Sequence, residues 1–381
     1  MIGRLVLCAS ILAGCGAAGA ADPALDKAVE GILKLGAEAR SGDPEVTLPL
    51  SELIPPQPSR EVAGTTLFRM FTPEMVEATR VAAEEGDARS QYRMGAYYES
   101  GTPPLAKDAP QALEWYRKSA AQGFAAAQFR VGQAFLIPDL GLQTDASAAA
   151  VQIRPAAERG YPPAQRTLAD MLQNGLGVPR DEAQAAVWYR KAADAGVRVA
   201  MTKLSWQLLL GRGVAKDEKE GIEWLRKAAD RNFAFARALL CGYEYAGTHL
   251  PRNPAAAFQA CSAVPEEALA QKLLAHMYLT GQGTVRDPGR AVEWYRKAAL
   301  QGDGAALSSL GDLYGSGTGV RRSAVTAYLL KEMAVRQGFA KATADRERIS
   351  VLVTDAERNR AARLAGEWKR GQPLPGGAGS P

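Results

Sequence analysis

The sequence predicts an all-α protein, an α/α superhelical solenoid of about seven helix pairs followed by C-terminal capping helices. Two observations lead to this prediction. The string "AVEWYRKAALQG" from Ala291 returns with few changes as "ALEWYRKSAAQG" from Ala112 and as "AAVWYRKAADAG" from Ala185. Equivalent sites recur every 34 to 37 residues, which is the period of a two-helix repeat. They are Ala96, Gln133, Asp170, Trp206, Gly242, His276 and Asp312.

Composition agrees with a folded helical chain. The 381 residues are 47% hydrophobic but only 7% aromatic, so small side chains must let helices approach closely. The formal charge of +5 comes without a run of Lys or Arg, and we therefore predict no nucleic-acid partner.

Residues 1–20 resemble an export signal. Arg4 precedes the apolar run "LVLCASIL", which is too short to span a bilayer. The segment Leu12–Cys15 resembles the lipobox of bacterial lipoproteins, in which Cys15 would carry the lipid that anchors the chain to a membrane. Gly16 then favours the outer membrane. The alternative is cleavage after Ala20, which would leave an exported protein without a lipid.

Residues 21–72 differ from the rest of the chain. Leu25, Ala28, Ile32 and Leu35 have helical spacing and predict one short amphipathic helix. The following "LPLSELIPPQPSREVAG" is rich in Pro and reads as an extended linker. Two interpretations remain open, a tether that holds the array away from the membrane and a helix that caps the first repeat.

Residues 73–338 carry the repeats. In "RTLADMLQNGLGVPRDEAQAAVWYRKAADAG" from Arg166, a first helix is expected from Gln165 to about Asn174. The glycines end it, Asp181 caps the second helix, and that helix runs to the Ala-Gly boundary.

The second helix of each pair explains why the strings repeat. In the copy from Ala291, the small residues Ala291 and Ala298 share a face with Tyr295, which is expected to fill the gap between neighbouring helices. Glu293 and Lys297 are spaced to form an ion pair worth about 0.3–0.5 kcal/mol. One helix pair cannot bury its face alone, so every repeat must carry the same pattern.

These motifs resemble the Sel-1-like repeat, a longer relative of the tetratricopeptide repeat. "ALSSLGDLYGSGTGV" (306–320) and "RDPGRAVEWYRKAALQG" (286–302) match its pattern residue by residue. The resemblance covers about residues 74–338. It implies a superhelix that binds other proteins on its concave face, often as an adaptor in exported or envelope complexes.

Several segments depart from the repeat. Pro155 lies within the second helix of repeat two, which we expect to be kinked or shortened. Repeat five has "THLPRN" for its turn and lacks the Trp, so the stack is expected to bend there. Residues 339–371 predict two capping helices, and residues 372–381 a disordered tail.

Two cysteines fall in the repeats. Cys241 takes the small Gly site of a first helix, and Cys261 takes the Tyr site of the second helix in the same repeat. Antiparallel packing of the two helices would place the cysteines side by side. In an exported protein we therefore expect a disulfide between them in preference to two buried thiols.

No motif indicates an enzyme. The two histidines, His249 and His276, belong to no zinc-binding pattern, and the nucleophile motifs of serine hydrolases and penicillin-recognising enzymes are absent from the sequence. "GSGTG" (315–319) recurs between paired helices, which indicates turns and not a phosphate loop. We therefore predict no catalysis, no metal and no cofactor.

The resemblance to tetratricopeptide-like folds implies which side chains line the concave groove. The alternative interpretation, for Phe129 and Trp206 above all, is packing between successive first helices. The implied groove residues are Tyr92, Glu99, Phe129, Gln133, Arg166, Asp170, Trp206, Tyr245 and His276.

The function expected from these features is a non-enzymatic scaffold in the bacterial cell envelope that binds another envelope or secreted protein. An alternative is a glycan or peptidoglycan binder, with Trp206 and nearby tyrosines stacking on sugars. A hydrolase is third, because some relatives of this repeat carry a β-lactamase label that no motif here supports. Exposed aromatic residues clustered in one groove would favour sugar, and mixed charges would favour protein.

Overall fold

The computed structural model describes residues 72–376. Within this range the chain forms seventeen α-helices and one short 3-10 helix, and these residues contain no β-strand. The all-α prediction is confirmed. The chain divides into two compact units between Trp224 and Leu225, and each is described by itself. The signal segment, Cys15 and the predicted helix and linker before residue 72 lie outside the described residues.

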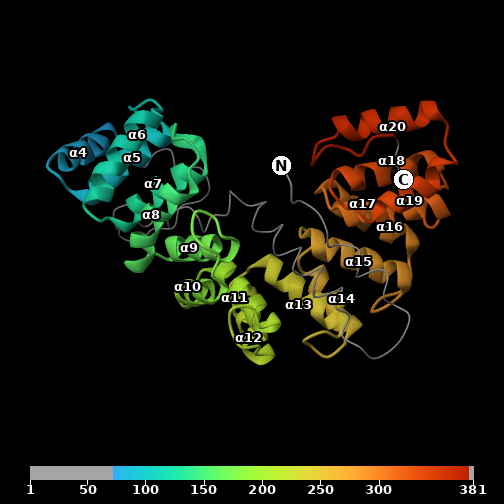
Figure 1. Cartoon of the computed structure of the whole chain (residues 1–381). Helices are drawn as coiled ribbons and strands as arrows, with labels where there is room; N and C mark the ends of the chain where they lie inside the picture. Colours follow the sequence, from blue (N-terminus) through green and yellow to red (C-terminus); the bar gives the residue numbers. More distant parts are fainter. Residues whose placement is uncertain (1–71, 377–381) are drawn as a thin grey trace. The chain divides into compact units, whose positions relative to one another are not determined.

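The N-terminal unit begins with one unpaired helix, after which the helices follow in pairs. From α4 to α11, each helix packs against the next one along the chain (Figure 1). The elements are α4 (Pro73–Glu84), α5 (Ala88–Ser100), α6 (Ala109–Ala121), α7 (Ala125–Leu136), η2 (Pro138–Leu140), α8 (Ala146–Glu158), α9 (Pro162–Asn174), α10 (Glu182–Asp194), α11 (Arg198–Leu210) and the first half of α12 (Glu218–Asp230).

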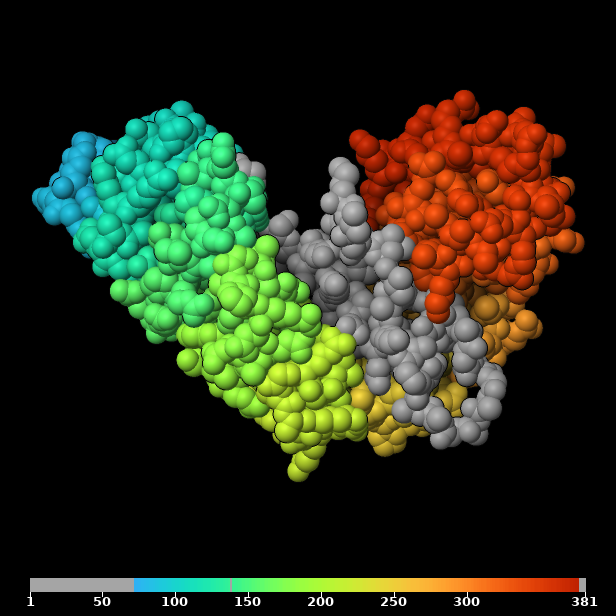
Figure 2. All heavy atoms as spheres, in the orientation of Figure 1, coloured from blue at the N-terminus to red at the C-terminus, as the bar shows by residue number. Residues whose placement is uncertain are grey.

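The C-terminal unit continues the same arrangement. It holds the end of α12, then α13 (Ala234–Ala246), α14 (Pro254–Ser262), α15 (Ala268–Thr280), α16 (Pro288–Leu300), α17 (Gly304–Ser316), α18 (Ala324–Arg336), α19 (Ala342–Ser350) and α20 (Asp355–Glu367). The seven predicted pairs are thus α5/α6 through α17/α18. We call the first member of each pair helix A and the second helix B. In each unit the colours of the filled surface change in chain order, because every repeat borders its sequence neighbours (Figure 2).

Caps and glycines set the ends of the helices. The Asp181 side chain accepts a hydrogen bond from the backbone N–H of Gln184 (2.8 Å) and caps α10, as the sequence predicted. Gly175 ends α9 with φ of +67°. Gly177 also has a positive φ, and a Cβ there would lie 2.1 Å from the carbonyl oxygen of Ala146 at the start of α8. One glycine therefore ends the helix and the other lets the turn lie against the preceding repeat.

Small residues on helix A make room for a tyrosine on helix B. Tyr116, Tyr189 and Tyr295 are among the largest fully buried side chains. A Cβ added at Gly95 of α5 would lie 2.6 Å from the ring of Tyr116. The repeated Tyr therefore fills the space between paired helices, and a glycine opposite it is required where the helices are closest.

The expected ion pair between Glu293 and Lys297 is wrong. The Lys297 ammonium lies 3.9 Å from the centroid of the half-buried Trp294 ring, one turn away, where the cation meets the face of the indole. Lys191 lies over Trp188 in the same way (4.0 Å), so the recurring W-x-x-K spacing forms a cation–π contact in these repeats.

Two departures from the repeat pattern have different outcomes. Helix α8 is 13 residues long, as α10 and α16 are, so of the two outcomes expected from Pro155, a kink or a shortening, the shortening is wrong. Pro155 frees the carbonyl of Val151, whose residue is 68% exposed, and solvent can satisfy that group. In repeat five, α14 is only nine residues long. Pro265 follows shortly after its end and disfavours further helix.

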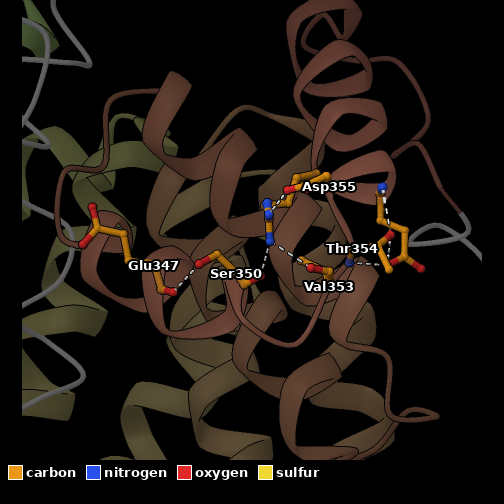
Figure 3. Close-up of polar contacts among 7 residues, drawn as sticks. Glu347, Ser350, Val353, Thr354 and Asp355 are labelled. Carbon is orange, nitrogen blue, oxygen red and sulfur yellow. Dashed lines mark hydrogen bonds and ion pairs between the residues drawn. The ribbon is translucent and has the colours of Figure 1, made fainter.

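Two C-terminal helices, α19 and α20, pack on α18 as the predicted caps. The turn between them is held by Arg358, whose guanidinium donates to the carbonyl oxygens of Ser350 (2.6 Å) and Val353 (2.9 Å) (Figure 3). Thr354 and Glu357 form a capping box at the start of α20.

The predicted tail needs a correction at its start. Residues 372–376 are described, and Leu374 is buried. The Trp368 indole N–H donates to the carbonyl oxygen of Gln372 (3.0 Å), which ties the chain end to α20. Burial of the Leu374 side chain removes apolar surface from water and so favours an ordered chain end. The composition of residues 372–381 alone did not predict this.

Candidate functional site

The structure divides the nine predicted groove residues into two groups. All nine lie on A helices, namely α5, α7, α9 and α11 in the N-terminal unit and α13 and α15 in the C-terminal unit. Five of them form a buried group, which leaves little of these side chains for a partner to contact. These five are only 2–7% exposed: Tyr92, Phe129, Trp206, Tyr245 and His276.

Aromatic neighbours explain the burial. Tyr92 packs on Tyr116 of its own repeat and on Phe124 at the start of α7, with ring centroids 5.3 and 5.4 Å apart. Phe129 packs on Tyr161 at the start of α9 (5.5 Å). These rings join one repeat to the next, which agrees with the packing interpretation of Phe129.

Glu99 forms the first charged cluster of the N-terminal unit. It accepts hydrogen bonds from the Tyr116 hydroxyl (2.6 Å) and from Arg130 on the following A helix (2.6 Å), and Arg130 also binds Asp139 (2.8 Å). Burial alone would raise the pKa of Glu99, but the hydrogen bonds and charge of Arg130 outweigh it and the net pKa is lowered. Burial, then the Glu99 charge, raises the pKa of Tyr116. The hydroxyl therefore stays a donor at neutral pH.

Asp170 forms the second cluster, two repeats later. Its carboxylate accepts from the Tyr189 hydroxyl (2.5 Å) and from Arg166 (2.8 Å), and Lys203 on the following A helix lies 4.0 Å away. The side-chain amide of Gln173 lies 2.7 Å from the same hydroxyl. Burial, with the Asp170 charge, raises the pKa of Tyr189 as well.

The two clusters share one design. A helix B tyrosine donates to a helix A carboxylate of its own repeat, and a cation from the next A helix reaches back to that carboxylate. We call Glu99, Arg130, Arg166 and Asp170 the charged A-helix surface. Their side chains are 12–33% exposed, so they are held in fixed positions yet remain accessible to solvent. Such groups can form charge-assisted hydrogen bonds with a partner.

The C-terminal unit fills the equivalent positions differently. His276 stands where Asp170 stands, and Tyr295 where Tyr189 stands. The His276 ring packs edge-on against Tyr245 (5.8 Å), and neither of its nitrogens has a hydrogen-bond partner. Burial lowers the pKa of His276. Lys272, one turn earlier on α15, binds Asp303 (3.0 Å).

Sequence reasoning missed Lys331. It occupies the Tyr site of α18, and its fully buried ammonium binds Asp312 (2.6 Å), Ser308 (2.8 Å) and Asp345 of α19 (2.9 Å). The last pair of the array is thereby joined to the first capping helix. The repeat alignment could have predicted this cluster, because it places a lysine at the buried Tyr position and a buried ammonium requires carboxylates nearby.

The two repeat cysteines lie where the register placed them. The structure pairs Cys241 of α13 with Cys261 of α14 as a disulfide, with 5.6 Å between their Cα atoms and both residues buried. This separation is ordinary for a disulfide.

Within residues 72–376, no group of three or more His, Cys, Asp or Glu side chains is placed to hold a metal ion. Nor does this range contain a helix of the length and hydrophobicity needed to cross a bilayer.

Comparisons with known proteins fit this geometry. The Sel1 repeat pattern matches residues 88–124, 162–197, 198–233, 268–303 and 304–339. A Sel1 repeat protein from Oxalobacter formigenes is 28% identical, with a TM-score of 0.59 over 64% of this chain and 96% of that one. A protective antigen of uropathogenic Escherichia coli strains, described as displaying an SLR fold, is 27% identical, with a TM-score of 0.51 over 77% of this chain and 70% of the other.

No protein with a curated description matches the chain. The five matched segments each span one helix A, one helix B and the turn that follows, so the sequence pattern and the observed helix pairs describe the same unit. The chain therefore carries Sel1 repeats in these five segments.

Proposed function

We propose that this protein is a scaffold of the bacterial cell envelope that binds another envelope or secreted protein through its A helices. The five Sel1 repeats carry the proposal, because Sel1 repeat proteins are generally scaffolds for protein interactions and are generally not enzymes. Export and a lipid anchor at Cys15 are supported by the sequence of residues 1–20.

The binding surface we propose is the charged A-helix surface with Gln133 between its two clusters. Gln133 is half-buried and lies on α7, the A helix between those that carry Glu99 and Asp170. Alternating carboxylates and guanidinium groups, already fixed by their neighbours, suit a partner with mixed charges more than a strongly acidic or basic one.

Burial of the aromatic residues weakens the glycan alternative. A ring that stacks on a sugar must expose one face, whereas Trp206 and Tyr245 are buried. The Arg212 guanidinium also lies over the Trp206 ring, 4.7 Å from its centroid. Mixed charges with buried rings favour a protein partner over a sugar.

Photocrosslinking in intact cells tests the proposed surface. A benzoylphenylalanine at Gln133 is expected to give an adduct with one envelope protein. The matched control places it at Val285, which is 84% exposed in the turn between α15 and α16. Equal adducts from both positions, or none from either, would contradict binding at the A helices.

Cell fractionation tests the anchor separately. The wild-type protein is expected in the membrane fraction and a Cys15→Ala variant in the soluble or uncleaved pool. If the variant fractionates like the wild type and is still processed, the protein is exported without this lipid.

A further inference from the structure

Helix α4 has the register of a helix B. Its residues 75–86, "MVEATRVAAEEG", align with 112–123, "ALEWYRKSAAQG", in α6 and the turn after it. Both strings end at a glycine with positive φ, Gly86 and Gly123, and a new helix A begins two residues later. Val76 and Ala83 of α4 are buried in a cluster with Met94 and Tyr97 of α5. Helix α4 thus packs on the following helix A as a helix B does.

The other face of α4 is open among the described residues. In repeat one, Ala112, Tyr116 and Ser119 face the helix A of their own repeat and are 0–1% exposed. Ser119, for instance, donates to the carbonyl oxygen of Ala88 in α5 (2.6 Å).

The equivalents on α4 are Met75, Thr79 and Ala82, and all three are only half-buried. No described helix A covers them. The array therefore begins, within residues 72–376, with half a repeat.

The sequence before residue 72 contains a segment with the pattern of the missing helix. Residues 34–42, "KLGAEARSG", align with 93–101, "RMGAYYESG", at the end of α5. Four positions are identical, including Gly36 at the close-contact site of Gly95 and Gly42 at the site of Gly101, the glycine that ends α5 with φ of +71°. Leu35 replaces Met94, which preserves an apolar residue.

We propose that residues 30–42 form the helix A of an additional first repeat and dock on Met75, Thr79 and Ala82 of α4. The segment lies outside the described residues, and the surface that receives it lies within them. Apolar residues of helix A meet the open face of α4, and Gly36 lies opposite Thr79 at the Tyr site.

One difference from repeat one agrees with a terminal position. Glu38 stands where Tyr97 packs against the preceding helix B. A first repeat has no predecessor, so this position faces water, and a polar outer face is what a terminal repeat needs.

The native disulfide supplies a direct test. Cys241 and Cys261 occupy the same two register positions in repeat five as Gly36 and Thr79, and their Cα atoms are 5.6 Å apart. A Gly36→Cys/Thr79→Cys variant of the full chain should therefore form a second disulfide spontaneously. The matched control is Gly36→Cys/Val81→Cys, because Val81 lies on the exposed side of α4.

Peptide mapping by mass spectrometry without reduction measures the link. We expect the 36–79 linked peptide in at least about tenfold excess over the 36–81 linked peptide, because disulfide geometry tolerates little displacement. Equal or absent crosslinking in two folded variants would overturn the proposal.

Hydrogen–deuterium exchange gives a second readout that needs no new cysteine. Deletion of residues 23–42 should raise exchange of the α4 amides about tenfold or more while leaving α20 unchanged. Unchanged exchange in α4 would mean that the segment does not cover it, and the open face would then be left for an amphipathic helix of a partner protein.

Discussion

The same substitution, Tyr to Phe, should lower the stability of the protein at one of two equivalent sites and not at the other. Tyr189 and Tyr295 occupy the Tyr site of helix B in repeats three and six, and both are fully buried. The Tyr189 hydroxyl donates to the Asp170 carboxylate (2.5 Å) and lies 2.7 Å from the side-chain amide of Gln173. The Tyr295 hydroxyl makes no hydrogen bond of ordinary geometry, and its polar neighbour is the side chain of Ser309.

The expected magnitudes follow from these contacts. Tyr189→Phe removes a hydrogen bond to a charged group, which contributes about 1.5–3 kcal/mol. Since the Asp170 side chain is 21% exposed, we expect a loss near about 1.5 kcal/mol. Tyr295→Phe removes a buried hydroxyl that makes no hydrogen bond of ordinary geometry, so the free energy of unfolding should be unchanged or higher by up to about 1 kcal/mol.

Urea unfolding followed by circular dichroism measures both variants. Hydrogen exchange in α10 and α16 assigns the change to the correct unit, because repeat proteins need not unfold in one step. Equal losses in the two variants would refute the reasoning, since the hydroxyl would then contribute nothing beyond the packing of the ring.

Three further predictions concern the C-terminal unit. Samples alkylated with and without prior reduction should differ in mass by two blocked thiols, from Cys241 and Cys261, and equal masses would exclude the disulfide. Burial lowers the pKa of His276 from 6.5, so the unfolded chain takes up a proton that the folded chain does not. Stability should therefore be complete above pH 6.5 and fall below it by at most about 1.4 kcal/mol per pH unit. His276→Gln should reduce this slope, and an unchanged slope would contradict the burial of a neutral imidazole. Lys331→Met should cost about 2–3 kcal/mol and loosen α19 in hydrogen exchange, because Asp312 and Asp345 lose their shared cation; an unchanged α19 would contradict the link to the cap.

The helix pairs could be predicted from the sequence because the same pattern of apolar, capping and glycine residues recurs in successive repeats. Asp108, for example, directly precedes the second helix of its pair. Asp181 and Asp287 lie at the same repeat position, and all three act as N-caps. Cys241 and Cys261 could be placed for the same reason, since a register gives positions on two paired helices at once.

The surface was harder to predict than the fold. The repeat pattern shows on which face of its helix a residue lies. It does not show that Phe129 is covered by Tyr161 from the next repeat, because that contact depends on how the repeats stack. The tight packing of small residues brings successive A helices close enough for one ring to cover another. Arg130 shows the same limit, because its pairing with Glu99 joins two repeats and neither repeat alone predicts it.

Partner capture tests the central claim most directly. The full chain, tagged at its C-terminus, is crosslinked in intact cells and purified beside an Arg166→Glu variant. This substitution places a second carboxylate one turn from Asp170 and reverses the charge on the proposed surface. We predict one enriched envelope protein that the variant loses while remaining folded by circular dichroism. Retention of the purified protein on isolated cell wall, with no protein enriched from cells, would contradict the scaffold and support the glycan-binding alternative.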